Sequence, residues 1–378
     1  MLRLSTPSID ESVIEAVNAV LRSGQLVYGA QGQRFESKLQ DFLGVRHAIV
    51  VSSGTAALHL ALLALGIGPG DAVLIPDFTF PATGNVVRLA GARPVLVDVD
   101  RATYCVTPES VSAAIDAWRG PEKLRAFIPV HEFGHPADMQ ALLPLVRHHG
   151  LKVVEDAACA IGATERGKAC GTHGDVGCWS LHPRKTLTTG EGGILSTNDD
   201  ALAAKLRLLR NHGMVRQPQG IRFDEPGYNL RLTDIQSAMG LAQLPHLPRW
   251  IDQRRTLAAV YRNALAPMVS AGLMTLPANH PEHSWQTFMV VLRADINRAT
   301  LIQELAGNGI EANLGAQCLS MQPAFEDIRP TPMTVHAPHL FKHGLALPFC
   351  ESYGPQQVVQ VADVLERLLS TPSVYQAT

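Results

Sequence analysis

The sequence lacks the features that mark several other classes of protein. No stretch approaches the roughly 20 consecutive apolar residues of a membrane-spanning helix, and the N-terminal residues contain no long apolar segment of the kind found in secretion signals. The six cysteines show neither paired CxxC spacing nor the density of a disulfide-stabilised protein. Internal repeats, low-complexity tracts and long charge runs are also missing. We therefore expect a folded cytoplasmic protein with free thiols.

Composition and charge further limit the class of protein to which the chain can belong. The chain has 378 residues, of which 46% are hydrophobic and 17% are charged, which suits a compact enzyme with room for two domains. The net charge of −2 argues against a broad surface for nucleic acid. An anionic ligand would need a local pocket of backbone amides and a few basic side chains.

From about residue 47, short β-rich runs alternate with helical patterns. The expected strands are HAIVVSS, AVLIPDF, RPVLVDVD, RAFIPV, LKVVED, VGCWSLH and GGILSTN. Helical segments separate the earlier strands, which predicts an α/β layer with a largely parallel sheet. The last two strands are too close in sequence for a crossover helix, so a mixed sheet is expected there.

The pattern changes after LTDIQSAMGLAQL, where PHLPRW supplies two prolines. We place a domain boundary there, with a large α/β domain at 1–245 and a small α+β domain at 246–378. In the small domain we expect strands at QTFMVVLR and GIEANLG, and helices at RATLIQELAGNG and PQQVVQVADVLERLLS.

Two short motifs match known functional patterns, but the residues around them argue against those functions. HEFGH, residues 131–135, matches the His-Glu-x-x-His pattern of zinc proteases, which requires both histidines on one face of a helix. Pro136 pushes His135 out of helical geometry, so we expect a strand-end loop facing a cleft, and no metal. GATERGKA imitates a phosphate loop, but Ala169 replaces the metal-binding hydroxyl, so a turn is expected.

Polar residues follow three of the expected strands. After the first, Gly54 and Thr55 begin a helix whose free amides suit a phosphate, although such residues are usually only helix caps. In VVEDAACAIGA, Asp156 ends an apolar strand, where a carboxylate is usually solvated or caps a helix. The functional alternative is that Asp156 pairs with a protonated ring nitrogen of a heterocyclic cofactor.

Lys185 follows a third strand in an unusual setting, between Pro183 and a turn rich in threonine and glycine. An isolated lysine is most often a surface charge. Desolvation beside Arg184 would instead lower its pKa and free the neutral amine for imine formation. Further along, Asn229 and Arg231 lie at the mouth of a helix.

The order of six segments resembles the DegT/DnrJ/EryC1/StrS family of pyridoxal-phosphate sugar aminotransferases. These segments are SSGTAAL, FTFPAT, VHEFGHPADM, EDAACAIGA, SLHPRKTLTTGEGG and GYNLRLTDIQSAMGLAQL, and the resemblance covers nearly the whole chain. It implies the aspartate-aminotransferase fold (fold type I), with a mixed seven-stranded sheet and a smaller C-terminal domain. Lysine at 185 favours an aminotransferase over the dehydratase branch, which has histidine there.

The resemblance also implies roles for individual residues. Lys185 would hold pyridoxal 5'-phosphate covalently and act as the catalytic acid and base. The other implied cofactor contacts are Asp156 at the pyridine nitrogen, Phe80 on the ring, Gly54, Thr55 and Ser180 at the phosphate, Asn229 at a phosphate in the neighbouring subunit, and Cys159, where many members have histidine or glutamine. His131, His182 and Arg231 are candidates for contacting substrate. A shared site makes a homodimer the smallest active unit.

For the reaction, the resemblance implies transfer of an amino group from L-glutamate to a nucleotide-linked keto-deoxyhexose in amino-sugar or polysaccharide biosynthesis. The segment SGQLVYGAQGQRFE resembles members that act at C4 of a 4-keto-6-deoxy sugar. Amination at C3 and a cyclitol ketone as acceptor stay open. A regulatory protein that kept the fold and lost catalysis is the alternative from another class.

Overall fold

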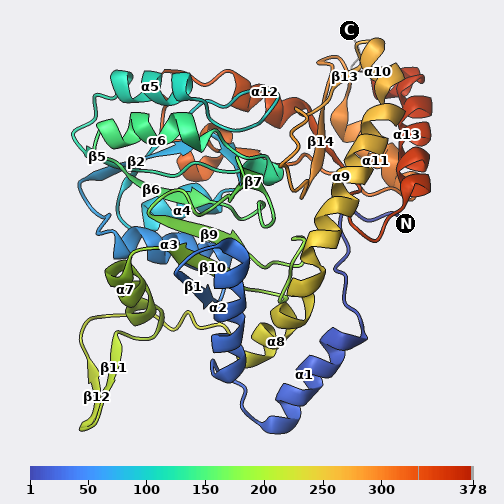
Figure 1. Ribbon diagram of the computed structural model, residues 1–378. Coiled ribbons are helices and arrows are strands. Elements are labelled where there is room, and N and C mark those ends of the chain that lie inside the picture. Colours follow the sequence, from blue (N-terminus) through green and yellow to red (C-terminus); the bar gives the residue numbers. More distant parts are fainter. Residues whose placement is uncertain (331, 376–378) are drawn as a thin grey trace.

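The computed structural model describes residues 1–330 and 332–375, and its centre is a seven-stranded sheet (Figure 1). The strands lie in the order β1-β10-β9-β6-β5-β2-β4. Their bounds are β1 His47–Val51, β2 Asp71–Pro76, β4 Arg93–Val97, β5 Lys123–Phe127, β6 Lys152–Asp156, β9 Val176–Ser180 and β10 Gly193–Thr197. From β9 to β4 neighbouring strands are parallel, whereas β10 is antiparallel to both β9 and β1. The seven predicted strands and the mixed sheet are confirmed.

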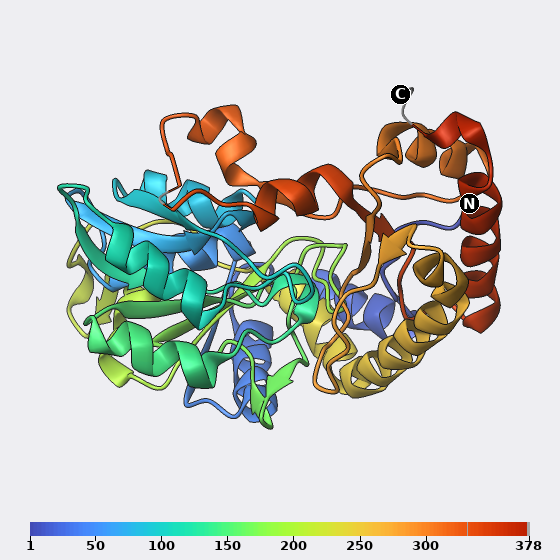
Figure 2. The same ribbon diagram turned by 90° about the horizontal axis from the view of Figure 1, so that it is seen from above.

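Helices cover both faces of this sheet (Figure 1, Figure 2). Successive side chains of each strand point to opposite sides. In β2, Val73 and Ile75 pack towards one group of helices, while Ala72 and Leu74 pack towards another. The first group is α3 Gly54–Ala64, α4 Ala82–Leu89 and α7 Asp200–Arg210; the second is α5 Pro108–Ala117 and α6 Met139–His148. Burial on both faces explains why the strands are nearly continuous apolar runs.

The C-terminal part has its own core around a three-stranded antiparallel sheet, β13-β14-β16. The strands are β13 Met274–Thr275, β14 Phe288–Leu292 and β16 Gly344–Leu347, and the helices around them are α9 Leu247–Ala264, α10 Ala266–Ser270, α11 Arg298–Gly307 and α13 Pro355–Leu369. The strand predicted at GIEANLG is wrong. Ile310 and Asn313 form isolated bridges with two different partners, Leu2 and Ala346, so no continuous ladder can form.

Contacts between residues that are distant in sequence join the two ends of the chain. Others connect the two cores. Leu2 N donates to Gly309 O at 2.7 Å, and Phe349 N donates to Leu4 O at 3.0 Å. The short strands β3 Phe78–Thr79 and β15 Gln317–Cys318 pair with each other, and α12 His336–His343 packs on the core of the large sheet. The division into 1–245 and 246–378 stays a prediction.

Three further features complete the fold. The helices α1 Glu11–Ser23, α2 Ala30–Leu43 and α8 Asp234–Gln243 pack together beside β1. The hairpin of β11 Met214–Gln217 and β12 Gly220–Phe223 projects from the body (Figure 1). The phosphate-loop imitation forms a tight turn between β7 Thr164–Glu165 and β8 Lys168–Ala169, as predicted. In the part of the chain that is described, no helix is long and apolar enough to cross a membrane.

Candidate active site

Lys185 lies in the loop after β9, and its side chain reaches the segment that follows β6. Its Nζ lies 2.9 Å from Cys159 Sγ. Burial alone would lower the pKa of Lys185, but the Cys159 thiol and the Asp156 and Glu132 carboxylates favour the charged amine and raise the pKa above its ordinary value. The prediction that desolvation beside Arg184 lowers this pKa is therefore wrong for the cofactor-free chain. Of these neighbours, Glu132 was not identified from the sequence.

Asp156 is the last residue of β6 and is only 4% exposed. Its carboxylate accepts hydrogen bonds from Thr83 Oγ1 at 2.7 Å and from Ala158 N at 3.1 Å. Burial raises the pKa of Asp156, since the ionised form loses its hydration. A protonated ring nitrogen would supply the counter-charge that this site needs.

The preceding residue, Glu155, serves the structure instead. Its carboxylate accepts from Gly171 N at 2.8 Å and Gly174 N at 2.6 Å, and it lies 2.9 Å from His131 Nε2. His131 Nδ1 accepts from Ala137 N at 3.0 Å, which leaves the proton on Nε2, facing Glu155. Both ring nitrogens of the fully buried His131 are thus used inside the protein, so neither is free for a substrate.

The HEFGH segment does not form the helix that a zinc protease requires. Glu132–Gly134 is a single 3₁₀ turn, and Phe133 adopts the left-handed backbone conformation with φ of 55°. Within residues 1–330 and 332–375, no three side chains from His, Cys, Asp and Glu are grouped so that they could hold a metal ion. The expected strand-end loop is confirmed.

The residues expected at the phosphate converge from two elements. Gly54 and Thr55 are the first residues of α3, and Ser53 caps the helix by accepting from Ala56 N. A Cβ added to Gly54 would lie 2.9 Å from Ser180 Cβ, closer than real Cβ contacts come. The N-terminus of α3 therefore packs directly against Ser180, a contact that only glycine at position 54 permits. The free amides of the helix and the Ser180 hydroxyl lie close together, and an anion is favoured there.

Three other predicted residues are accessible. Phe80 follows β3 and is 71% exposed, so its ring is free to cover a bound heterocycle. Asn229 is also exposed, and its backbone bridges Asn211. Arg231 Nη1 donates to Asn211 Oδ1 at 2.6 Å, which fixes the segment against the end of α7.

Two further predicted residues lie near Lys185, His182 in sequence and Cys159 in space. His182 is half-buried, and its Nδ1 accepts from Arg184 N at 3.2 Å; burial lowers its pKa. Cys159 touches the Lys185 amine, which agrees with its implied place beside the cofactor. Since Cys159 stands where a stronger hydrogen-bonding side chain is common, its thiol offers a weaker donor there.

Sequence reasoning missed Glu132. This side chain is 4% exposed, and burial together with the Asp156 charge raises its pKa to about 8. A hydrogen bond links it to Thr79, whose Oγ1 lies 3.3 Å from Thr83 Oγ1, which in turn donates to Asp156. A chain of polar groups thus joins the two buried carboxylates. The available signal was an acidic residue directly after an apolar strand, inside a motif that was interpreted only as a loop.

These residues fit pyridoxal phosphate. The N-terminus of α3 beside Ser180 favours a phosphate, the buried Asp156 carboxylate calls for a cationic partner, and the Lys185 amine lies in the field of Asp156. The three groups come from different elements, yet all lie at the carboxyl ends of strands β1, β6 and β9.

Comparisons with known proteins agree with this chemistry. The sequence model described as the DegT/DnrJ/EryC1/StrS aminotransferase family matches residues 7–366. DesV of S. venezuelae, whose structure was determined with a ketimine intermediate, is 34% identical over 95% of this chain and 94% of its own, with a TM-score of 0.85. A family member from Brucella abortus is 32% identical over 95% and 96%, with a TM-score of 0.88.

A third similar structure is PseC of Helicobacter pylori, an aminotransferase involved in the biosynthesis of pseudoaminic acid. It is 25% identical over 97% of this chain and 98% of its own, with a TM-score of 0.89. The match across the family, the expected fold and the assembled lysine and aspartate lead to one conclusion. The chain belongs to the DegT/DnrJ/EryC1/StrS aminotransferase family and is a sugar aminotransferase that depends on pyridoxal phosphate.

Proposed function

We propose that the protein transfers the amino group of L-glutamate to C4 of a nucleotide-linked 4-keto-6-deoxyhexose, for amino-sugar or polysaccharide biosynthesis in the cytoplasm. The observation that carries the aminotransferase chemistry is that the Lys185 amine reaches Cys159 Sγ, in the segment that follows the buried Asp156 carboxylate. PseC, whose described role is in the biosynthesis of pseudoaminic acid, supports a sugar pathway. The N-terminal segment SGQLVYGAQGQRFE favours C4 over C3.

In this proposal each residue has a defined task. Bound pyridoxal phosphate supplies an electron sink for the carbon that carries the amino group. Gly54, Thr55 and Ser180 hold the phosphate, Phe80 covers the ring, and Asp156 keeps the ring nitrogen protonated. Lys185 Nζ removes and returns a proton at the reacting carbon, in one direction for L-glutamate and in the other for the keto-sugar.

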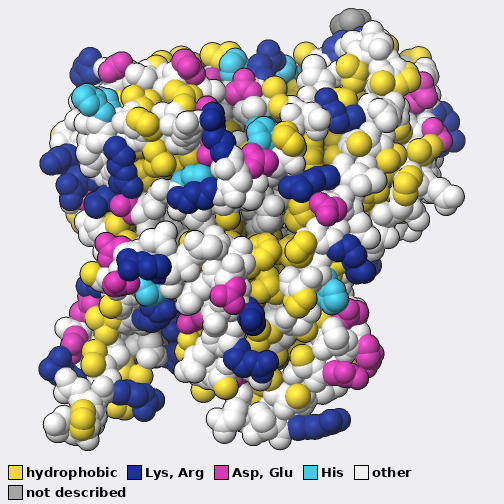
Figure 3. Space-filling view, in the orientation of Figure 1, with side chains coloured by type: hydrophobic (Ala, Val, Ile, Leu, Met, Phe, Trp, Pro, Cys, Tyr) yellow, Lys and Arg dark blue, Asp and Glu magenta, His cyan; other side chains and the backbone are white. Residues whose placement is uncertain are grey.

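The second subunit would complete the site. Asn229 is exposed, and Tyr228 beside it is 42% exposed. On the projecting hairpin Ile221 and Phe223 are 54% and 64% exposed, and Figure 3 shows hydrophobic side chains there. Apolar side chains on a projecting ribbon favour contact with another protein surface. We propose that this surface is a second copy of the chain.

Mixing two inactive variants tests the shared site. Lys185→Ala and Asn229→Ala dimers should each be inactive or weak, whereas mixed dimers should regain activity, because one of their two sites carries both changes and the other carries neither. Activity that never exceeds that of the separate variants, in a mixture shown to exchange subunits, would contradict sharing through Asn229.

The substrate is tested by incubating the holoenzyme with L-glutamate and a panel of nucleotide-linked 3-keto and 4-keto sugars and cyclitol ketones. We expect 2-oxoglutarate and an amino sugar whose NMR spectrum places nitrogen at C4. Amination only at C3, or only of a cyclitol, would replace the proposed acceptor within the same family. Failure of amino donors to bleach the cofactor absorbance would favour the regulatory alternative.

A further inference from the structure

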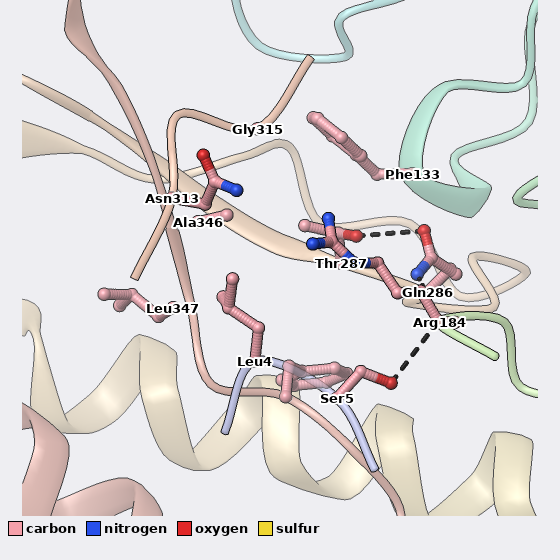
Figure 4. Close-up of a pocket in the computed structure, with 11 residues that line it drawn as sticks. Leu4, Ser5, Phe133, Arg184, Gln286, Thr287, Asn313, Gly315, Ala346 and Leu347 are labelled. Carbon is pink, nitrogen blue, oxygen red and sulfur yellow. Dashed lines mark hydrogen bonds between the residues drawn. The ribbon is translucent and has the colours of Figure 1, made fainter. Parts of the chain in front are cut away.

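A small hollow lies beside Arg184, where the loop that carries Lys185 meets the C-terminal sheet (Figure 4). Its volume is about 70 Å³. A cavity needs roughly 10–15 Å³ on the same measure to hold one water molecule, so the hollow has room for a carboxylate. The lining residues include Leu4, Phe133, Arg184, Asn313, Gly315 and Leu347.

Arg184 supplies the charge of this hollow. Its backbone carbonyl accepts from Gln286 Nε2 at 2.9 Å and from Ser5 Oγ at 3.4 Å, so the backbone is fixed from the side of the small sheet. The guanidinium extends into the hollow, and no hydrogen bond joins it to the other side chains drawn in Figure 4. A planar guanidinium presents paired N–H donors that match a carboxylate.

Asn313 supplies a second donor whose orientation is fixed by its surroundings. Its Oδ1 accepts from Leu314 N at 2.7 Å, so the oxygen is already used and the Nδ2 amide remains to donate. Gln286, by contrast, uses both ends of its amide, because its Oε1 accepts from Thr287 Oγ1 at 2.9 Å. Arg184 and Asn313 therefore each offer side-chain N–H donors to a ligand in the hollow.

The residues that line the hollow favour an anion that is attached to an apolar chain. The described residues that line the hollow include no aspartate or glutamate, while Phe133 and Leu347 offer apolar surface. Two of the lining residues are next in sequence to residues of the Lys185 site: Arg184 precedes Lys185, and Phe133 follows Glu132, whose carboxyl acts on Lys185. A ligand held here by one end can place its other end towards the Lys185 site.

We propose that Arg184 and Asn313 form the binding site for a carboxylate group of the amino donor. This inference rests on the proposed function, because it assigns a place to the donor in the same active site. A phosphate of the nucleotide-linked sugar has similar anionic oxygens, but the apolar walls favour a carboxylate on a methylene chain. Both anions belong in the test.

The test uses glutarate, a dicarboxylate without the amino group, so that binding is measured without reaction. Titration calorimetry on the holoenzyme should show glutarate binding about 10- to 100-fold weaker in Arg184→Gln, which loses a hydrogen bond to a charged group. Asn313→Asp should abolish binding, because the new carboxylate repels the ligand and pairs with Arg184. This variant keeps an oxygen to accept from Leu314 N, so the local fold is preserved.

Arg119→Gln is the matched control, because Arg119 lies on the surface after α5, where its Nη1 donates to the backbone oxygens of Asp116 and Trp118. It should bind glutarate like the wild type. Unchanged glutarate affinity in both Arg184→Gln and Asn313→Asp would overturn the proposal. A loss of uridine diphosphate binding without a loss of glutarate binding would overturn it in favour of the nucleotide phosphate.

These outcomes are separate from the fate of the proposed function. One outcome is that L-glutamate bleaches the cofactor absorbance of the wild type while the substitutions at Arg184 and Asn313 leave the affinity for glutarate unchanged. In that case only the proposed donor site is wrong. If wild-type absorbance never responds to any amino donor, the proposed function fails first. The cofactor absorbance of Arg184→Gln, measured before any donor is added, should equal that of the wild type.

Discussion

Replacing Glu132 with glutamine should make the protein more stable at neutral and alkaline pH. Glutamine has nearly the same shape and keeps a hydrogen-bonding amide for Thr79, but it cannot ionise. In the native chain the Glu132 carboxyl is 4% exposed and close to the Asp156 charge, and its pKa is raised to about 8. Ionising it inside the fold is costly, whereas ionising it in the unfolded chain is not.

The direction and magnitude of the stability change follow from this difference in the cost of ionising Glu132. The folded protein holds a proton on Glu132 up to about pH 8, and the unfolded chain releases it above pH 4.5. Stability from this group is therefore full below pH 4.5 and is lost as the pH rises from 4.5 to about 8. A rise of the pKa across that interval corresponds to a loss of roughly 5 kcal/mol, as an order of magnitude. At pH 7 the expected gain from Glu132→Gln is about 3 kcal/mol.

The measurement is urea unfolding of the cofactor-free wild type and Glu132→Gln, at equal protein concentration and at pH 5.5, 7 and 8.5. The difference in the free energy of unfolding between Glu132→Gln and the wild type should increase with pH. The exposed Glu326 gives a control variant, Glu326→Gln, whose stability should follow the wild type. If Glu132→Gln and the wild type lose stability in parallel across this range, the buried, protonated carboxyl that we infer is absent.

Two further substitutions test the site and its support. Gly54→Ala should weaken cofactor binding at least tenfold in a fluorescence titration, because the added Cβ would lie 2.9 Å from Ser180 Cβ; unchanged affinity would show that the phosphate lies elsewhere. His131→Ala should lower the free energy of unfolding by about 3 kcal/mol, because it removes the Nε2–H that donates to the buried Glu155 carboxylate. The KM for substrate in the folded fraction should stay near that of the wild type, and a change confined to KM would contradict the structural role of His131.

The large sheet could be predicted because its strands are local features. Each is a short apolar run buried on both faces, and the helices between them carry their own start signals, such as the Thr107 cap before Pro108. The pairing of Phe78–Thr79 with Gln317–Cys318 had no such signal, since two-residue strands far apart in sequence show no period. The strand expected at GIEANLG failed for a related reason, because its residues are shared between separate partners.

In the site, residues at strand ends and helix starts could be assigned, but their interactions could not. Lys185 and Asp156 follow recognisable strands, and the family resemblance implied their roles. The raised pKa of Lys185 depends on Glu132 and Cys159, which reach it from two other segments. His131 looked like a cleft residue, yet its partner Glu155 is 24 positions away, in the neighbouring strand β6.

The central claim is that the amine of Lys185 carries the cofactor. Borohydride reduction of the holoenzyme, followed by peptide mass spectrometry, should find the pyridoxyl group on the peptide that contains Lys185, and Lys185→Ala should yield no labelled peptide. A label on another lysine, or a labelled peptide that persists in Lys185→Ala, would contradict the account.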